Sequence, residues 1–173
     1  MNTFIIGIIA GIISGILASI IAHLIVYLSK PRIEISENIA KQNGDNGPEY
    51  RIKIVNKSKA YAKDLSIQVN LIHYGTAING TILSAEPLKL ARNDIAFIEP
   101  YNKNDLESKY AIRIRILSDL KSRWQDDTID YIEAKVFCTN EFTGAGKVFS
   151  QKYSKKLLIK EGVFAAGKST DII

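Results

Sequence analysis

Residues 162–169, with the sequence Gly-Val-Phe-Ala-Ala-Gly-Lys-Ser, match the formula of a phosphate-binding loop. In such a loop the backbone amides surround a phosphate, the lysine contacts the outer phosphates, and the hydroxyl binds magnesium. The chemistry also needs a following helix whose N-terminus faces the anion. Only residues 170–173 follow here, so neither that helix nor a second magnesium ligand is available. We interpret the match as chance and expect residues 161–173 to form a flexible, glycine-rich C-terminal tail.

Few other side chains are suited to catalysis or metal binding. His23 lies inside a long apolar segment, and His73 lies at the end of an expected strand. The single cysteine, Cys138, alternates with Val136 and is interpreted as a small apolar core residue. One group of carboxylates is interpreted as a solvated loop: Asp126, Asp127 and Asp130. Because no Cys/His spacing is typical of a metal site, we expect no enzyme, no metal and no cofactor.

Positive charge is the feature that remains, because the chain carries 23 Lys and Arg against 18 Asp and Glu, a net charge of +5. Lys109, Arg113 and Arg115 share one face of an expected strand, and Arg51 and Lys53 share a face of another. Further basic residues are interleaved with aromatics near the C-terminus: Lys147, Phe149, Lys152, Tyr153, Lys155, Lys156 and Lys160. This pattern suits a phosphate backbone and stacked bases. The alternative, favoured for any single residue, is a solvated domain attracted without specificity to an anionic leaflet.

We therefore predict a ligand-binding face made of Arg113, Arg115, Lys109, Arg51 and Lys53. Arg113 and Arg115 are the preferred pair, because two guanidinium groups on one sheet face hold phosphates in fixed geometry. The expected ligand is a nucleotide or an oligonucleotide.

The element that positions these residues in the cell is the apolar segment 4–28, which contains no Asp, Glu, Lys or Arg. As a helix it would be roughly 37 Å long, enough to cross a ~30 Å hydrocarbon core. A cleaved signal peptide is less consistent with its length and with the absence of a basic start. Lysine and arginine follow the segment but do not precede it, so the positive-inside rule predicts a single-pass inner-membrane protein. Its N-terminus lies outside and its β domain in the cytoplasm.

Small residues occupy about half of the circumference of this predicted helix. They are Gly7, Ala10, Gly11, Ser14, Gly15, Ala18 and Ala22, with His23 at the edge of the face. Small residues allow helices to approach closely in membranes, so we predict a homo-oligomer through this face. A face this wide suits a ring of helices, which would enclose a narrow pore or form a tight bundle without a lumen. The alternative is a passive anchor.

Residues 33–160 are predicted to form one cytosolic domain. Apolar and polar residues alternate in short runs at regular intervals, with turn residues between them and almost no helix. This pattern is typical of an antiparallel sandwich, with a small β-barrel as the alternative. The segment Tyr50 to Tyr74 resembles the early strands of bacterial immunoglobulin-like domains. The predicted fold is one transmembrane helix followed by an all-β, immunoglobulin-like sandwich.

The combination of Gly7, Gly11 and Gly15 in one span with a basic β domain carrying Arg113 and Arg115 resembles small bacterial membrane effectors of anti-phage defence. It is most similar to the effector of Hailong systems. The resemblance implies an ion channel gated by a single-stranded DNA oligomer, with a DNA-synthesising nucleotidyltransferase as the functional partner. The alternatives are a membrane-anchored binding or scaffold module with a passive anchor, and a subunit of an envelope assembly.

Overall fold

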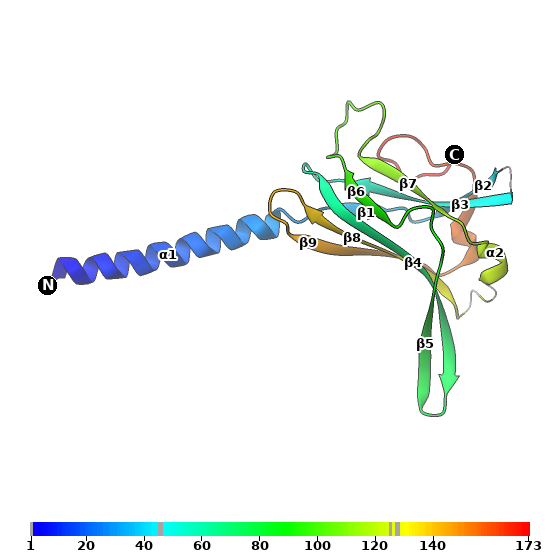
Figure 1. The fold of residues 1–173 in the computed structure, drawn as a ribbon, viewed down its shortest axis with the longest axis horizontal. Helices are drawn as coiled ribbons and strands as arrows, with labels where there is room; N and C mark the ends of the chain where they lie inside the picture. Colours follow the sequence, from blue (N-terminus) through cyan, green and yellow to red (C-terminus); the bar gives the residue numbers. More distant parts are fainter. Residues whose placement is uncertain (1, 45–46, 125, 127–128) are drawn as a thin grey trace.

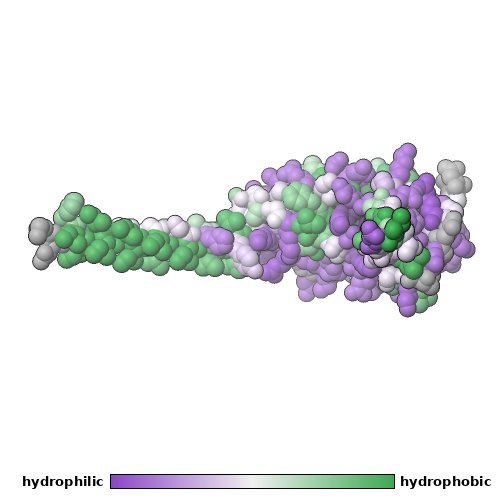
Figure 2. Space-filling view, turned by 90° about the horizontal axis from the view of Figure 1, so that it is seen from below, coloured by the Kyte–Doolittle hydropathy of each residue, from purple (hydrophilic) through white to green (hydrophobic). Residues whose placement is uncertain are grey.

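A single long helix leads into two β-sheets in the computed structural model, which describes residues 2–44, 47–124, 126 and 129–173. Helix α1 covers Asn2–Leu28 and extends away from the sheets along the longest axis of the molecule (Figure 1). It is long and apolar enough to cross a membrane, and none of its apolar window is buried against the rest of the chain. Figure 2 shows an almost continuous hydrophobic surface along this helix, which gives way to hydrophilic side chains where it meets the domain.

The first sheet contains five strands, with β3 (Gly47–Asn56) in its centre. One edge of β3 pairs with β7 (Ala111–Ile116), and the other edge pairs with β1 (Ile33–Ile35) and then β2 (Ile39–Gly44). Strand β10 (Ile159–Glu161) extends the sheet by pairing in parallel with β2. The sandwich is therefore not purely antiparallel as predicted, because this last pair joins segments about 120 residues apart in a parallel register.

The second sheet is antiparallel throughout its described pairs and is built around β4 (Ala62–Ala77) and β8 (Tyr131–Asn140). Strand β9 (Gly146–Tyr153) covers one side of β8. Strands β6 (Asp94–Ile98) and β5 (Gly80–Pro87) pair with successive parts of the edge of β4 that lies opposite β8. Two short helical elements complete the chain, namely α2 (Leu120–Arg123) and the 3-10 turn η1 (Lys156–Leu158).

The two sheets enclose one hydrophobic core. Alternating residues point inward from each strand, so that Ile52 and Ile54 of β3 and Ile114 of β7 face Val69 of β4 and Val136 of β8 in a single cluster. This alternation is what the sequence predicted from the period of two. The described strand pairs form two separate sheets around a shared core, which favours the sandwich over the barrel.

Trp124, the only tryptophan in the chain, closes one end of this core. Its side chain is 0% exposed and its indole Nε1 donates a hydrogen bond to the carbonyl of Asp130 at 3.2 Å. Trp124 follows directly after α2, and Asp119 caps this turn by accepting from the Lys121 amide. Asp127, which was interpreted from the sequence as part of a solvated loop, lies outside the described residues.

The outer part of the β4–β5 hairpin projects from the sandwich at the end far from α1 (Figure 1). Residues 74–85 contain no charged side chain, and the whole stretch is exposed. Ile78 at the tip is fully exposed. The outer part of the hairpin therefore depends on its own ladder, from Gly75–Ile82 to Ala77–Gly80.

Candidate anion-binding face and helix-packing face

Four of the five predicted ligand-binding residues lie together on the outer face of the β3–β7 pair. Arg51 is directly opposite Arg115 in the register, and Lys53 is directly opposite Arg113. Their neighbours Ile52 and Ile114 point into the core, so the alternation of each strand turns the basic side chains outward. Two adjacent antiparallel strands thus gather four cations that are far apart in the sequence.

Lys109, the fifth predicted residue, does not belong to this face. Strand β7 begins at Ala111, after a turn in which Ser108 adopts a positive φ of 56°. The Lys109 ammonium pairs with Glu107 at 2.9 Å, and this contact raises the pKa of the lysine. The prediction that Lys109 extends the strand face is wrong, because the turn ends the alternation before β7 starts.

A carboxylate of the chain itself neutralises part of the basic face. Glu49 accepts from Arg51 Nη2 at 2.7 Å through one oxygen and from Arg115 Nη1 at 2.9 Å through the other. The hydrogen bonds from Arg51 and then from Arg115 lower the pKa of Glu49 below its ordinary value. An anionic ligand that reaches these two arginines has to compete with Glu49.

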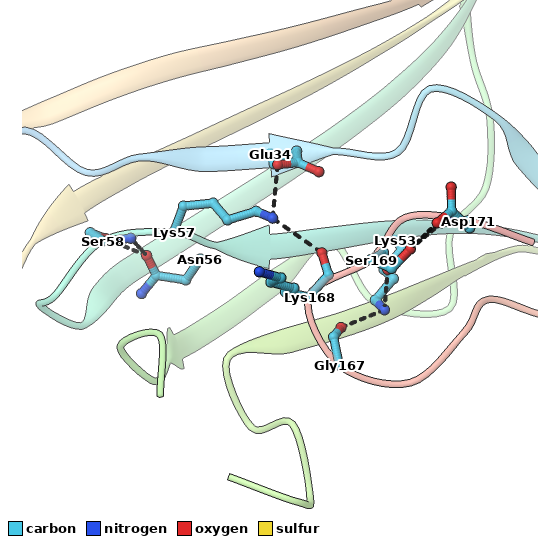
Figure 3. Close-up of polar contacts among 9 residues, drawn as sticks. All are labelled: Glu34, Lys53, Asn56, Lys57, Ser58, Gly167, Lys168, Ser169 and Asp171. Atoms are coloured by element: carbon cyan, nitrogen blue, oxygen red, sulfur yellow. Dashed lines mark hydrogen bonds and ion pairs between the residues drawn. The ribbon is translucent and has the colours of Figure 1, made fainter. Parts of the chain in front are cut away.

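Lys53 is buried, with 1% of its surface exposed, and is no ligand-binding residue in this conformation. Its ammonium donates to the backbone carbonyls of Gly167 and Ser169 at 2.7 and 2.6 Å (Figure 3). It also donates to the Ala165 carbonyl at 2.7 Å. Burial, followed by the charges of Arg113 and Lys57, lowers the pKa of Lys53 to about 8. The expectation that Lys53 is available on an open face is therefore wrong.

Lys57 makes a second contact to the same C-terminal segment. Its ammonium donates to the Lys168 carbonyl at 3.1 Å and pairs with Glu34 at 2.9 Å (Figure 3). Arg113 Nη2 also donates to the Phe164 carbonyl at 3.2 Å. Three cations thus hold backbone oxygens of residues 164–169.

The C-terminal residues are folded onto the domain, which corrects the expected flexible tail. Residues 163–173 turn back on themselves, with paired hydrogen bonds between Val163 and Ile173 and a bridge between Phe164 and Ile172. The Phe164 side chain is 4% exposed. The tail was expected to be flexible because it is glycine-rich and C-terminal, but backbone pairing and lysine–carbonyl contacts hold it on the domain.

The stretch that matches a phosphate-binding loop has the opposite polarity from such a loop. Its carbonyl oxygens, at Ala165 and Gly167, converge on the Lys53 ammonium, whereas a phosphate needs converging N–H groups. Lys168 is exposed, and its carbonyl accepts from Lys57. This geometry supports the interpretation that the match is chance.

A small cavity of about 240 Å³ remains between the basic face and the C-terminal segment. It is lined by Ala40, Gln42, Arg51, Arg113, Val163 and Phe164. Arg51 Nε is buried here and has no hydrogen-bond partner among the described residues. Buried donors are normally satisfied, so this N–H and the neighbouring Arg113 guanidinium mark the place where an anionic oxygen is best received.

The predicted helix-packing face lies on α1, which no other described part of the chain covers. A Cβ atom added at Gly7, Gly11 or Gly15 would meet nothing within 4 Å. A hollow along the edge of this face is lined by Ile12, Gly15, Ile16, Ser19, Ile20, His23 and Leu24. Ser19 Oγ donates back to the Gly15 carbonyl at 2.9 Å, so its hydroxyl is satisfied within the helix. The small residues leave room that the chain itself does not fill.

The sequence analysis missed an ionic cluster at the base of the β4–β5 hairpin. His73 Nδ1 lies 2.9 Å from Asp130 and its Nε2 lies 3.6 Å from Glu86, which also contacts Arg123. Asp130 is buried, with 8% of its surface exposed. His73 lies on β4 and Glu86 on β5, whereas Asp130 precedes β8, so no spacing in the sequence reveals the cluster. We interpret the cluster as a clamp on the hairpin, since no group of three or more potential metal ligands is found among the described residues.

Cys138 lies in the core, as the alternation of its strand predicted, and is 0% exposed. Burial raises the pKa of its thiol to about 11, which makes a nucleophilic thiolate unfavourable.

No protein-family model and no curated protein matches the chain. The basic face of β3 and β7 and the small-residue face of α1 are therefore the features that bear on function.

Proposed function

We propose that this protein is a homo-oligomeric membrane effector in which α1 spans the inner membrane and self-associates through its small-residue face. The observation that carries the proposal is the exposed glycine face of α1, because Gly7, Gly11 and Gly15 have open space beside them and no partner within the described chain. Each glycine in a helix costs about 1 kcal/mol relative to alanine, and close helix packing offsets that cost.

The arrangement in the membrane follows from charge. Lys30 and Arg32 come directly after α1, while residues 1–28 contain no Lys, Arg, Asp or Glu. By the positive-inside rule the N-terminus faces outward and the β-sandwich, with its immunoglobulin-like pattern, lies in the cytoplasm.

The activity we propose is ion conduction along the axis of the assembled helices. Gly, Ala and Ser residues would line a narrow pore, with Ser14 in its wall and His23 close to its cytoplasmic end. Ionisable groups inside spans are functional candidates by default. Each of these side chains lies on or beside the face that we assign to helix packing, so assembly and conduction depend on the same residues.

The β-sandwich is proposed to regulate this path by binding a phosphate-rich ligand, a nucleotide or a single-stranded DNA oligomer, on the basic face. The ligand would compete with Glu49 for Arg51 and Arg115 and would place one phosphate oxygen near the unpartnered Arg51 Nε. Exposed sides of Arg113 and Arg115 would receive the neighbouring phosphates. A partner nucleotidyltransferase would supply such a ligand, and anti-phage defence is the proposed setting.

The proposal is tested with the full-length protein in detergent and in liposomes. We expect an oligomer by mass measurement in detergent and an ion leak from loaded liposomes. Gly11→Leu places a large side chain on the packing face and is expected to abolish both, whereas Ile13→Leu, on the opposite face of α1, is the matched control. A monomeric wild-type protein, or a Gly11→Leu variant with unchanged leak and oligomer, would refute the proposal.

The second candidate is a membrane-anchored binding module whose helix is passive. It is favoured by one observation, namely that the Ser19 hydroxyl of α1 donates to the Gly15 carbonyl within the helix and therefore needs no partner on another helix. This candidate requires that a glycine-free membrane helix in place of residues 4–28 preserve ligand binding and function. Its topology is tested with a cysteine introduced at exposed Lys103 and labelled in intact cells, because the native Cys138 is buried.

A further inference from the structure

A cavity of about 520 Å³ lies where α1 joins the β-sandwich. Its lining comes from the end of the helix, the turn after β3 and the loop after β8, and includes Leu28, Lys30, Arg32, Lys57, Lys59 and Phe142. The volume is within the ~300–1,000 Å³ typical of small-molecule sites. Three separate segments of the chain therefore converge on one concave site at the base of the helix.

The lining carries strong positive charge without internal compensation. Four of its residues are Lys or Arg, and none of the described residues in the lining is acidic. Lys57 is paired with Glu34, and the nearby Glu141 accepts the Tyr61 amide. Arg32 and Lys59 are exposed, and no ion pair involves either of them among the described residues. Two cations are thus available to a bound anion.

Apolar side chains border the same cavity. Leu28 and Phe142 have 70% and 81% of their surfaces exposed to solvent, although both are large and hydrophobic. A site for a free, water-soluble phosphate has no need of such a border. An amphipathic ligand, with a charged head and an apolar body, matches both parts of the lining.

The depth of the cavity agrees with this chemistry. The 27 residues of α1 correspond to about 40 Å of helix, close to the ~40–45 Å of a bilayer that includes its headgroup regions. The Lys30 ammonium lies 4.5 Å from the centre of the Tyr27 ring, a pairing of aromatic and cation that suits the interface. If the span is inserted as proposed above, the cavity opens at the level of the headgroups.

A second hollow, of about 380 Å³, also borders the end of α1 and the residues that follow it. It shares Lys30 and Arg32 with the first and adds Lys147 from β9 and the apolar Tyr27. Lysine and arginine side chains are therefore gathered at the end of α1 that would leave the bilayer.

We infer that the cavity at the end of α1 binds the phosphate headgroup of an anionic phospholipid. Arg32 and Lys59 contact the phosphate, and Leu28 and Phe142 contact the first part of the acyl chains. The inference rests on the proposed membrane insertion of α1 but not on oligomer formation, ion conduction or a ligand on the basic face. It assigns to the base of the helix a site separate from Arg51 and Arg113.

The test uses the full-length protein purified in a mild detergent from vesicles that contain phosphatidylcholine and phosphatidylglycerol. Retained lipid is measured by native mass spectrometry. We expect enrichment of phosphatidylglycerol on the wild-type protein and a loss of between about fivefold and thirtyfold in the Arg32→Gln/Lys59→Gln variant, since each cation at a membrane surface contributes about 1 kcal/mol. The variant Lys89→Gln/Lys103→Gln removes the same charge from exposed positions elsewhere and is expected to retain lipid normally.

Three outcomes would overturn the inference. The first is equal retention of phosphatidylglycerol by both double variants. The second is displacement of the lipid by inorganic phosphate or a short single-stranded DNA at low millimolar concentration, which would make this a site for soluble phosphates. The third is failure of the wild-type protein to remain with the membrane after alkaline extraction, which would also remove the proposed function. If lipid selectivity alone fails while the oligomer and the leak persist in pure phosphatidylcholine, the proposed function stands without this site.

Discussion

The ammonium of Lys53 lies 2.7 Å from the carbonyl oxygen of Gly167, which is 114 positions further along the chain. Together with two neighbouring carbonyls, this contact holds the C-terminal segment over the basic face of β3 and β7. A lysine that the sequence suggests as a ligand contact instead connects the first sheet to the last residues described. The proposed ligand-binding face is therefore limited to Arg51, Arg113 and Arg115.

Lys53→Met is expected to release the C-terminal segment. The substitution keeps the length of the side chain but leaves three carbonyls without their donor, and an unsatisfied buried polar group costs about 1–3 kcal/mol. Hydrogen exchange should become faster at the Val163 and Ala165 amides, which are paired within the segment. Lys63→Met, at an exposed position of β4, is the control and should leave exchange unchanged. Equal exchange in both variants would mean that backbone pairing alone holds the segment.

Stability is expected to depend on pH through the same lysine. Burial lowers the pKa of Lys53 from 10.5 to about 8 in the folded domain. Between these two values the unfolded chain holds a proton that the folded domain has lost, so the free energy of unfolding rises with pH. The measurement is urea unfolding of the wild type and of Lys53→Met from pH 7 to pH 10.5. The free energy of unfolding of the wild type minus that of Lys53→Met should increase with pH above about 8. A decrease would mean that the three carbonyl contacts affect the pKa of Lys53 more than burial does.

Glu49→Gln is expected to strengthen the binding of phosphate-rich ligands. It removes the internal carboxylate from Arg51 and Arg115, and because exposed ion pairs contribute about 0.2–1 kcal/mol, the gain should be up to about fivefold. Fluorescence anisotropy with a labelled single-stranded DNA oligomer measures the dissociation constant at several salt concentrations.

The control for this prediction is Glu107→Gln, which frees Lys109 outside the basic face. It should leave affinity unchanged, because Lys109 lies before β7. The double variant Arg113→Ala/Arg115→Ala should weaken binding and reduce its salt dependence. If this double variant binds as the wild type does, the ligand site lies elsewhere.

Trp124→Ala is expected to destabilise the domain by about 3–5 kcal/mol, since it removes a fully buried indole from the end of the core. Trp124→Phe should cost less, because it keeps most of the packing and loses mainly the hydrogen bond to the Asp130 carbonyl. Thermal unfolding followed by circular dichroism compares the two with Phe142→Ala, whose exposed side chain makes it a near-neutral control. A similar loss in all three variants would show that Trp124 does not anchor the core.

The helix and most strands were predictable because their signals are local. The apolar stretch before Lys30 has no charge to interrupt it, and Ile52, Ile54 and Ile114 repeat at every second position. Strand β2 was missed because only Ile39 and Ala40 are apolar in it, so its remaining residues resemble a loop.

The arrangement of the candidate site was only partly predictable. Alternation correctly turned Arg51, Arg113 and Arg115 away from the core, and the register of two strands brings them together. The position of the C-terminal segment over these residues was not predictable. Contacts between a lysine and backbone carbonyls depend on the path of the chain and do not require particular residue types at the carbonyls. The His73–Asp130 contact was not predictable either, because its residues are 57 positions apart.

The parallel pairing of β10 with β2 has a consequence for the biosynthesis of the protein. Ile39 emerges from the ribosome soon after α1, but its partner Ile159 is made only after almost the whole domain has been translated. Until then the outer edge of β2 has no partner strand, and an open strand edge is a template for another chain. The interval between these two events is therefore when neighbouring nascent copies are most able to exchange strands, and the synthesis of residues 159–161 ends it.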